Sequence, residues 1–69
     1  MEKELIFLVE EAPEGGYIAR ALGHSIFTES ETLDGIREEI KKAVRCHFEE
    51  EHLPRLVRLH FIKEEVVAM

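Results

Sequence analysis

The sequence predicts a small α+β domain in which one helix packs across a mixed four-stranded sheet, with the element order β-β-β-α-β. Three observations indicate this fold class. A short, unbroken apolar run covers residues 5 to 9, an apolar stripe of helical period follows Thr32, and apolar and polar residues alternate after Pro54. Together they predict a strand near the start, one long helix in the second half and a strand after the helix.

The first strand is predicted over residues 3 to 10 and leads into a hairpin. Its apolar run ends at the turn sequence EAPEG, a pattern typical of a central strand with both faces covered. Gly15 and Gly16 supply the backbone angles that a hairpin corner requires. The second and third strands are then expected at residues 17–22 and at about 25–29.

The long helix is predicted to begin after Thr32 and to end near His52 or a few residues earlier. The Thr32 hydroxyl can accept a hydrogen bond from a free backbone N–H, and Asp34 suits the positive end of the helix dipole. Pro54 disfavours helical geometry in the residue before it, so the helix cannot reach that point. The apolar stripe consists of Leu33, Ile36, Ile40, Ala43, Val44 and Phe48.

The last strand is predicted in RLVRLHFIKEEVV, where Val57, Leu59 and Phe61 alternate with Arg58 and His60. It runs parallel to the first strand. A right-handed crossover through the helix then places it beside the first strand, which gives the spatial order 3-2-1-4. The first strand becomes central, in agreement with its unbroken apolar run.

Length and composition limit the classes of function. Residues 1–69 are expected to form a single domain with a marginal core, since folding at this size buries only ~60% of the surface of the unfolded chain. The net charge of −6 disfavours nucleic acid as the main ligand and fits a basic protein partner. The acidic residues are 14 Glu and a single Asp, and Asn and Gln are absent, a composition similar to that of thermophilic proteins.

The sequence favours a cytoplasmic location without membrane contact. Cys46 is the only cysteine, so no internal disulfide can form. The start MEKELIFLVEE is acidic and has only five consecutive apolar residues, unlike a secretory signal. Every apolar run is far shorter than the ~20 residues of a membrane-spanning helix.

No combination of residues predicts catalysis, a cofactor or a bound metal. The glycines of PEGGY lead into a strand and lie among glutamates without a lysine, so a hairpin corner is favoured over a phosphate-binding loop. Cys46 and His47 are neighbours on a helix and diverge by ~100°, which excludes a nucleophile–base pair. Adding His52 does not give the spacing of a structural zinc site. His60 is interpreted as a half-exposed strand residue.

The stretch GGYIARALGHSIFTESETLDGI resembles the signature region of the HicB-like antitoxin family, with its Gly-Gly-Tyr-x-Ala corner, Pro-Gly before the third strand and Gly-x-Thr-x-x-Glu-Ala entry into the helix. His24-Ser25 stands in place of Pro-Gly, Ser30 in place of glycine, and Asp34-Gly35 in place of Glu-Ala. Glycine in the first helical turn should weaken helix initiation by ~1 kcal/mol. The matching residues are Gly15, Gly16, Tyr17, Ala19, Thr28, Thr32 and Leu33.

The resemblance implies a fold similar to a reduced ribonuclease-H core. It also implies a role in a toxin–antitoxin system, binding and masking a small basic HicA-type toxin that cleaves RNA. Many family members carry a DNA-binding segment after the last strand, but only about six residues follow Lys63 here, so direct nucleic-acid binding is not expected. Two alternatives stay open: a self-associating structural protein without a toxin partner, and a small-ligand binder or enzyme with a site between subunits around His60 or His24.

One helix can cover only one face of the predicted sheet, and the other face is also partly apolar. Ile6, Leu8 and Ile62 are therefore the candidate interface of a homo-oligomer, most simply a dimer. Residues 66–69, VVAM, offer another route, as a strand added to an open sheet edge.

Overall fold

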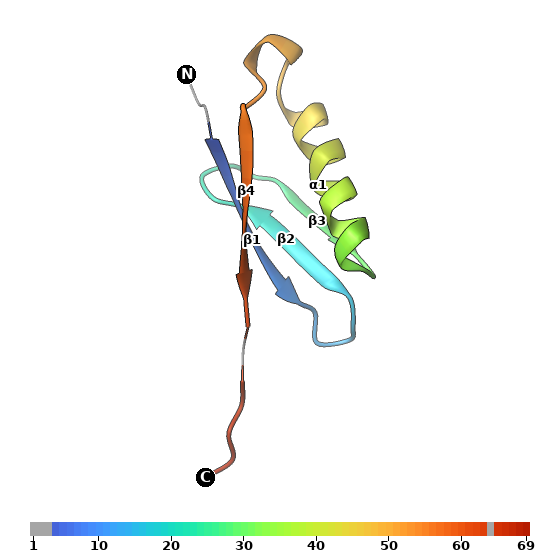
Figure 1. Cartoon of the computed structure of the whole chain (residues 1–69), viewed down its shortest axis with the longest axis vertical. Helices are drawn as coiled ribbons and strands as arrows, with labels where there is room; N and C mark the ends of the chain where they lie inside the picture. Colours follow the sequence, from blue (N-terminus) through green and yellow to red (C-terminus); the bar gives the residue numbers. More distant parts are fainter. Residues whose placement is uncertain (1–3, 64) are drawn as a thin grey trace.

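The computed structural model describes residues 4–63 and 65–69, and Figure 1 shows their arrangement. The predicted element order is confirmed, with a short 3-10 helix added before the last strand. The first strand was predicted from position 3, which lies outside the described residues. The elements are β1 (Glu4–Glu11), β2 (Tyr17–Ala21), β3 (Phe27–Ser30), α1 (Leu33–His47), η1 (Glu50–His52) and β4 (Leu56–Ile62).

The strands form one mixed sheet in the order β3-β2-β1-β4, which confirms the predicted topology. The central strand β1 pairs antiparallel with β2, where Val9 lies opposite Ala19. It pairs in parallel with β4, where Phe7 lies opposite Leu59. The strands β3 and β4 are thus the two edges of the sheet, and the chain continues beyond β4 away from the body of the molecule (Figure 1).

Two adjacent glycines form the corner of the β1–β2 hairpin. Gly15 and Gly16 have positive φ angles of 102° and 83°. Gly16 is required for a second reason, because a Cβ atom there would lie 2.9 Å from the backbone oxygen of Ser30 on β3. The Ala12 N–H donates to the Gly16 carbonyl at 2.9 Å and closes the turn. The glycines lead into a strand, as predicted for a hairpin corner.

The helix α1 begins at the predicted position. Thr32 Oγ1 accepts a hydrogen bond from the Gly35 N–H at 2.9 Å, and Asp34 lies in the first turn. The helix ends at His47, because Phe48 adopts extended angles while its N–H still donates to the Val44 carbonyl. The chain between the helix end and β4 contains η1.

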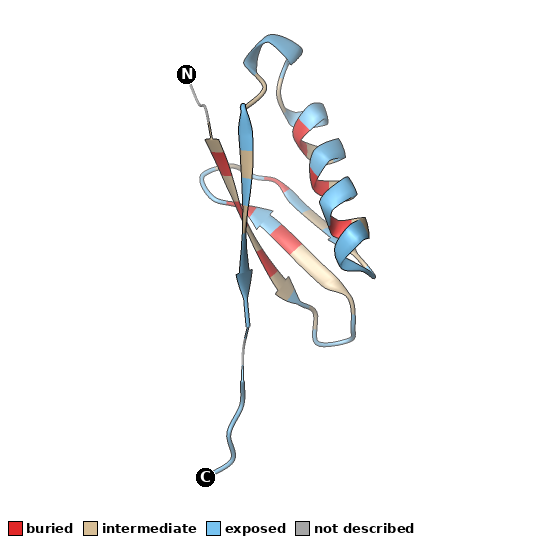
Figure 2. Cartoon of the chain, viewed as in Figure 1, coloured by how far each residue is buried: buried red, intermediate tan, exposed pale blue. Residues whose placement is uncertain are grey.

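The core lies between the sheet and α1, as Figure 2 shows by the buried residues on their facing sides. Along β1, buried residues alternate with the half-buried Ile6 and Leu8. The single chain therefore does not cover both faces of β1, contrary to the prediction from its apolar run, since its one long helix covers one face. The core residues are Leu5, Phe7, Val9, Ala19, Ala21, Ile26, Ile36, Ile40 and Val44.

The third strand begins later than predicted. Ile26 is buried in the loop before β3, and its carbonyl accepts a hydrogen bond from the Ala21 N–H at 3.0 Å. Phe27 opens the strand and is 63% exposed. The apolar pair Ile26-Phe27 therefore divides between the core and the surface, which the sequence pattern alone did not separate.

Candidate protein-binding surface

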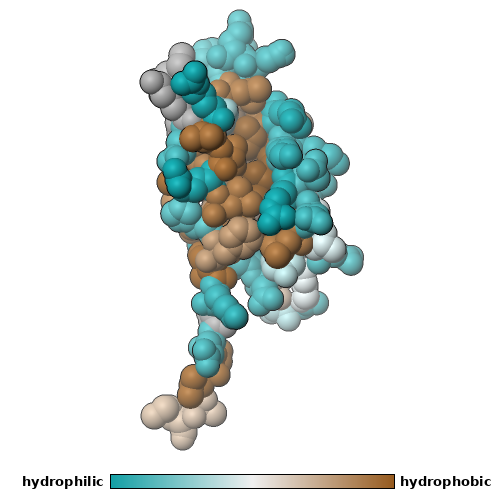
Figure 3. All heavy atoms as spheres, in the orientation of Figure 1, coloured by the Kyte–Doolittle hydropathy of each residue, from teal (hydrophilic) through white to brown (hydrophobic). Residues whose placement is uncertain are grey.

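The helix α1 packs mainly against β3 and β2, away from β4 (Figure 1). The core side chains of β2 are Ala19 and Ala21, whose small size lets the helix lie close to this strand. On the helix side of β4, Val57 and Leu59 are only half-buried and Phe61 is 54% exposed. Figure 3 accordingly shows a band of hydrophobic side chains between β4 and α1.

This band contains a hollow of 280 Å³, which we call the helix-side groove. Its apolar lining comes from both α1 and β4, and the basic side chains at its margin come from α1. Such a hollow can receive apolar anchor side chains of a protein partner. The groove is defined by Ile40, Val57, Leu59 and Phe61, with Arg37 and Lys41 at the margin.

A second hollow, of 240 Å³, continues from Phe61 toward the hairpin. Tyr17 at the start of β2 and Leu33 at the start of α1 line it, together with Glu11 and Lys63. The structure therefore brings two of the signature residues, Tyr17 and Leu33, beside Phe61. Four further signature residues serve the turn, the core and the helix start: Gly15, Gly16, Ala19 and Thr32. The last one, Thr28, lies on β3 opposite Ala19.

The charges at the margin of the helix-side groove are paired along α1. Arg37 Nη1 lies 2.9 Å from Asp34 Oδ1, and Lys41 Nζ lies 3.3 Å from Glu38 Oε2. Exposed pairs of this kind contribute little to stability. Their effect is to leave the margin close to neutral, so the groove itself does not select a partner by charge.

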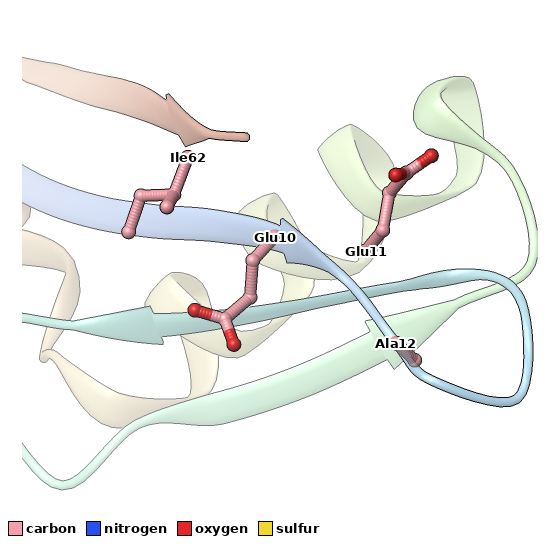
Figure 4. A pocket seen from close by; sticks show the side chains of 4 residues that line it. All are labelled: Glu10, Glu11, Ala12 and Ile62. Atoms are coloured by element: carbon pink, nitrogen blue, oxygen red, sulfur yellow. The ribbon is translucent and has the colours of Figure 1, made fainter. Parts of the chain in front are cut away.

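The hairpin end of the sheet is acidic. Glu10 and Glu11 line a shallow hollow of 240 Å³ with Ala12 and Ile62, and Glu14 follows in the turn. Figure 4 shows the two carboxylates pointing away from each other, because successive strand residues face opposite sides of the sheet. These carboxylates cannot act as a paired general acid and base on one substrate.

The predicted interface residues Ile6, Leu8 and Ile62 lie on the face of the sheet opposite α1. Ile6 and Leu8 are half-buried, whereas Ile62 is exposed. Arg58 stands beside Ile6 and donates to Glu4 Oε2 at 2.6 Å. This hydrogen bond, and the charge of the carboxylate, raise the pKa of the Arg58 guanidinium above its ordinary value. The apolar residues of this open face are thus interrupted by a charged pair.

The residues considered for chemistry are divided between two parts of the molecule, and Cys46 and His47 line one hollow with Ser25. Cys46 and His47 are exposed near the end of α1, whereas His60 is exposed on the open face of β4. Within residues 4–63 and 65–69, no three His, Cys, Asp or Glu side chains are placed to hold a metal ion. In the same ranges, neither helix has the length and apolar character needed to cross a membrane.

A ring cluster at the C-terminal end of α1 was not predicted. His24, from the loop after β2, packs edge-on against His47 and Phe48, with ring centroids 5.5 Å and 5.2 Å away. The rings of His47 and Phe48 are 4.9 Å apart. The cluster ties the β2–β3 loop to the helix end. No local sequence pattern joins residues so far apart in the chain.

Comparison with known proteins decides the family. The chain is 40% identical over 68 residues to a UPF0150 protein of Thermotoga maritima, and the match covers 99% of this chain and 96% of the relative. The chain belongs to the UPF0150 family. A UPF0150 protein of Archaeoglobus fulgidus is 58% identical over 52 residues, covering 75% of this chain and 77% of that protein. No family model and no solved structure matches the chain.

In this UPF0150 chain, the Thermotoga match is long enough to include the hairpin, α1 and β4, which together form the two hollows. The helix-side groove itself was missed by sequence reasoning, although a signal was present. The sequence of β4 adds a row of apolar side chains to the sheet: Val57, Leu59 and Phe61. The apolar side chains of the other strands are already enough to cover the single apolar stripe of α1. One helix is too narrow to cover the apolar side chains of all four strands, so the sequence could have indicated that one strand keeps its apolar side chains exposed.

Proposed function

We propose that this UPF0150 chain is a non-catalytic protein-binding module that masks a small basic RNA-cleaving toxin, as HicB-like antitoxins do. The helix-side groove is the observation that supports this proposal. Its apolar lining continues past Phe61 to Tyr17 and Leu33, which belong to the signature that the sequence resembles. The helix-side groove is partly exposed and mainly apolar, and the Arg37 and Lys41 side chains in its lining are paired with acids of α1, so it fits a protein anchor better than a small polar substrate.

The charge distribution supports a basic partner. The chain carries a net charge of −6, and Glu10, Glu11 and Glu14 cluster at the hairpin end. Glu11 also lines the hollow that contains Tyr17 and Leu33. Long-range attraction by these carboxylates would speed the approach of a basic protein, while apolar contacts in the groove would hold it. The association rate should therefore fall as the salt concentration rises.

The proposed mechanism is occlusion rather than catalysis. Glu10 and Glu11 face opposite sides of the sheet. Cys46 lies on α1, whereas His60 lies on β4, on the face of the sheet opposite α1. We expect the purified protein to leave RNA and ester substrates intact. Cys46 and His47 line one open hollow with Ser25, but as neighbours on α1 their side chains diverge by ~100° and both are exposed, so they do not form a nucleophile–base pair. Cleavage that copurifies with the protein and disappears in His60→Ala would contradict this mechanism.

Co-expression with a small basic protein encoded beside its gene is the direct test. We expect the wild-type chain to restore growth and to copurify with the toxin. Phe61→Ser and Leu33→Ser, which alter the two hollows, should weaken both effects. Phe27→Ser is the matched control, because Phe27 is 63% exposed on β3 and lines neither hollow. If no complex forms and growth is not restored, the self-associating structural protein becomes the better interpretation.

A further inference from the structure

The outer edge of β4 is open within the described chain. β4 is the last strand of the sheet, and its seven residues pair with β1 along the inner edge. An open edge presents backbone N–H and C=O groups that can pair with another strand. Two exposed apolar side chains, Phe61 and Ile62, stand at its C-terminal end. The edge is therefore a ready site for an added apolar strand.

Residues 65–69, which we call the C-terminal segment, continue beyond β4 and away from the body (Figure 1). Val66 is 88% exposed and Val67 is 67% exposed. Figure 3 shows a separate group of hydrophobic side chains toward the end of this segment, divided from the body by hydrophilic ones. Valine favours strands, because its branched side chain packs well on a pleated surface. The single chain leaves this strand-forming apolar segment without cover.

We propose that two copies of this chain associate by exchanging these segments, each adding a strand to the open β4 edge of the other copy. The pairing is antiparallel about a two-fold axis, so each contact occurs twice. Residues 65–69 can face the second half of β4 and the residue after it. This inference does not depend on the proposed toxin-masking function.

One pairing register matches the side chains best. In this register, the residue numbers of two facing residues, one from each copy, add up to 128. It places apolar residues opposite apolar residues and a lysine opposite a glutamate. The axis falls at position 64, outside the described residues, where the sequence has Glu, so this register sets two glutamates opposite each other between two Lys63–Glu65 pairs. With one residue from each copy, the facing pairs are Leu59 with Met69, Phe61 with Val67, Ile62 with Val66, and Lys63 with Glu65.

The two nearest registers that keep every side chain on its own face match less well. Moving the pairing by one step toward β4 puts Lys63 opposite the partner's Lys63 and Phe61 opposite the partner's Glu65. Moving it by one step the other way puts Glu65 opposite the partner's Glu65 and Lys63 opposite the partner's Val67. Each of the three registers opposes one pair of like charges on the axis, so the off-axis pairs decide between them. The favoured register puts no apolar side chain opposite a charge and pairs Lys63 with Glu65.

The exchange also completes the helix-side groove. In the proposed register the partner's Val67 and the partner's Met69 stand beside Phe61 and Leu59, on the side of the sheet that carries α1. The second copy therefore widens the apolar floor of the groove. The open-face route is less suited to association, because Ile6 and Leu8 are already half-buried and the Arg58–Glu4 pair lies beside them.

Sedimentation tests whether the segment makes the contact. We expect the wild-type chain to have twice the mass of the 8.0 kDa chain at micromolar concentration. Val66→Lys combined with Val67→Lys should give an 8.0 kDa monomer with unchanged helical circular dichroism, since the exposed segment does not support the fold of its own chain. A wild-type monomer, or a variant that remains dimeric, would overturn the proposal.

Cysteine pairs test the register in a Cys46→Ser background, which removes the exposed native thiol. Two double variants are compared: Phe61→Cys with Val67→Cys, and Ile62→Cys with Val66→Cys. In an antiparallel ladder, facing pairs alternate between hydrogen-bonded and non-hydrogen-bonded pairs, and one of the two kinds brings the side chains within disulfide reach. We expect mild oxidation to give a covalent dimer in at least one of them. Phe61→Cys with Val66→Cys is the control, because its side chains would face opposite sides of the sheet. Equal cross-linking of the control, or none in either test pair, would overturn the register.

Discussion

Ser30 and Gly35 share one space at the start of α1. A Cβ atom on Gly35 would collide with the hydroxyl oxygen of Ser30 and would lie 2.9 Å from Thr32 Oγ1. The signature that this region resembles has glycine at the position of Ser30 and residues with a Cβ atom in the first turn of the helix. The two departures from the signature therefore compensate, since a side chain at position 30 leaves no room for one at position 35.

This relationship predicts a coupled pair of substitutions. Gly35→Ala should gain ~1 kcal/mol of helix propensity but lose it to the contact with Ser30, so its net effect should be small or destabilising. Adding Ser30→Gly removes the contacts with the Ser30 side chain, although the one with Thr32 Oγ1 remains. We expect a coupling free energy on the order of 1 kcal/mol in favour of the double variant, measured by urea unfolding of all four proteins. Additive effects of the two substitutions would show that they do not share the space.

The hairpin glycines should respond differently to alanine. Gly15→Ala and Gly16→Ala both place a side chain at a positive φ angle, at a cost of about 1–2 kcal/mol. Gly16→Ala also brings its Cβ atom to 2.9 Å from the Ser30 carbonyl, whereas a Cβ atom on Gly15 meets nothing within 4 Å. Chemical denaturation should therefore rank Gly16→Ala as clearly less stable than Gly15→Ala. Equal losses would mean that the β3 backbone moves aside at little cost.

The sequence predicted the parts of the fold that depend on local pattern. The Thr32 cap follows from a hydroxyl residue placed before an apolar stripe, and the central position of β1 agrees with its unbroken apolar run, although one of its faces is not covered. The strand order follows from the handedness of the crossover through α1. Each of these inferences needs only neighbouring residues and a general chiral rule.

The sequence did not predict features that depend on where α1 lies across the sheet. The small Ala19 and Ala21 draw the helix toward β2, and this placement exposes the row that ends at Phe61. The contact of His24 with His47 likewise requires the loop and the helix end to be placed in space. Periodicity identifies which face of an element is apolar, but not how much of that face a neighbouring element covers.

The cap at Thr32 should be measurable by itself. Thr32→Ala removes the hydroxyl that accepts the Gly35 N–H, which should cost about 0.5–2 kcal/mol of unfolding free energy. Thr32→Ser keeps the oxygen and should retain most of the stability. Helical circular dichroism recorded during urea titration compares the two variants. If serine is as destabilising as alanine, the methyl group rather than the hydrogen bond accounts for the loss.

Two phenylalanines of opposite exposure give the sharpest test of the core. Phe7 is 0% exposed between the sheet and α1, so Phe7→Ala should leave a cavity and cost about 3–5 kcal/mol. Phe27 is 63% exposed, and Phe27→Ala should change stability by less than about 1 kcal/mol. The first loss is a large share of the ~5–15 kcal/mol that stabilises a typical domain, so Phe7→Ala should be largely unfolded at temperatures where Phe27→Ala remains folded. Both variants must be compared at one protein concentration, because association of two copies would add to the apparent stability. Similar unfolding midpoints would contradict the placement of Phe7 in the core and, with it, the packing of α1 on this face of the sheet.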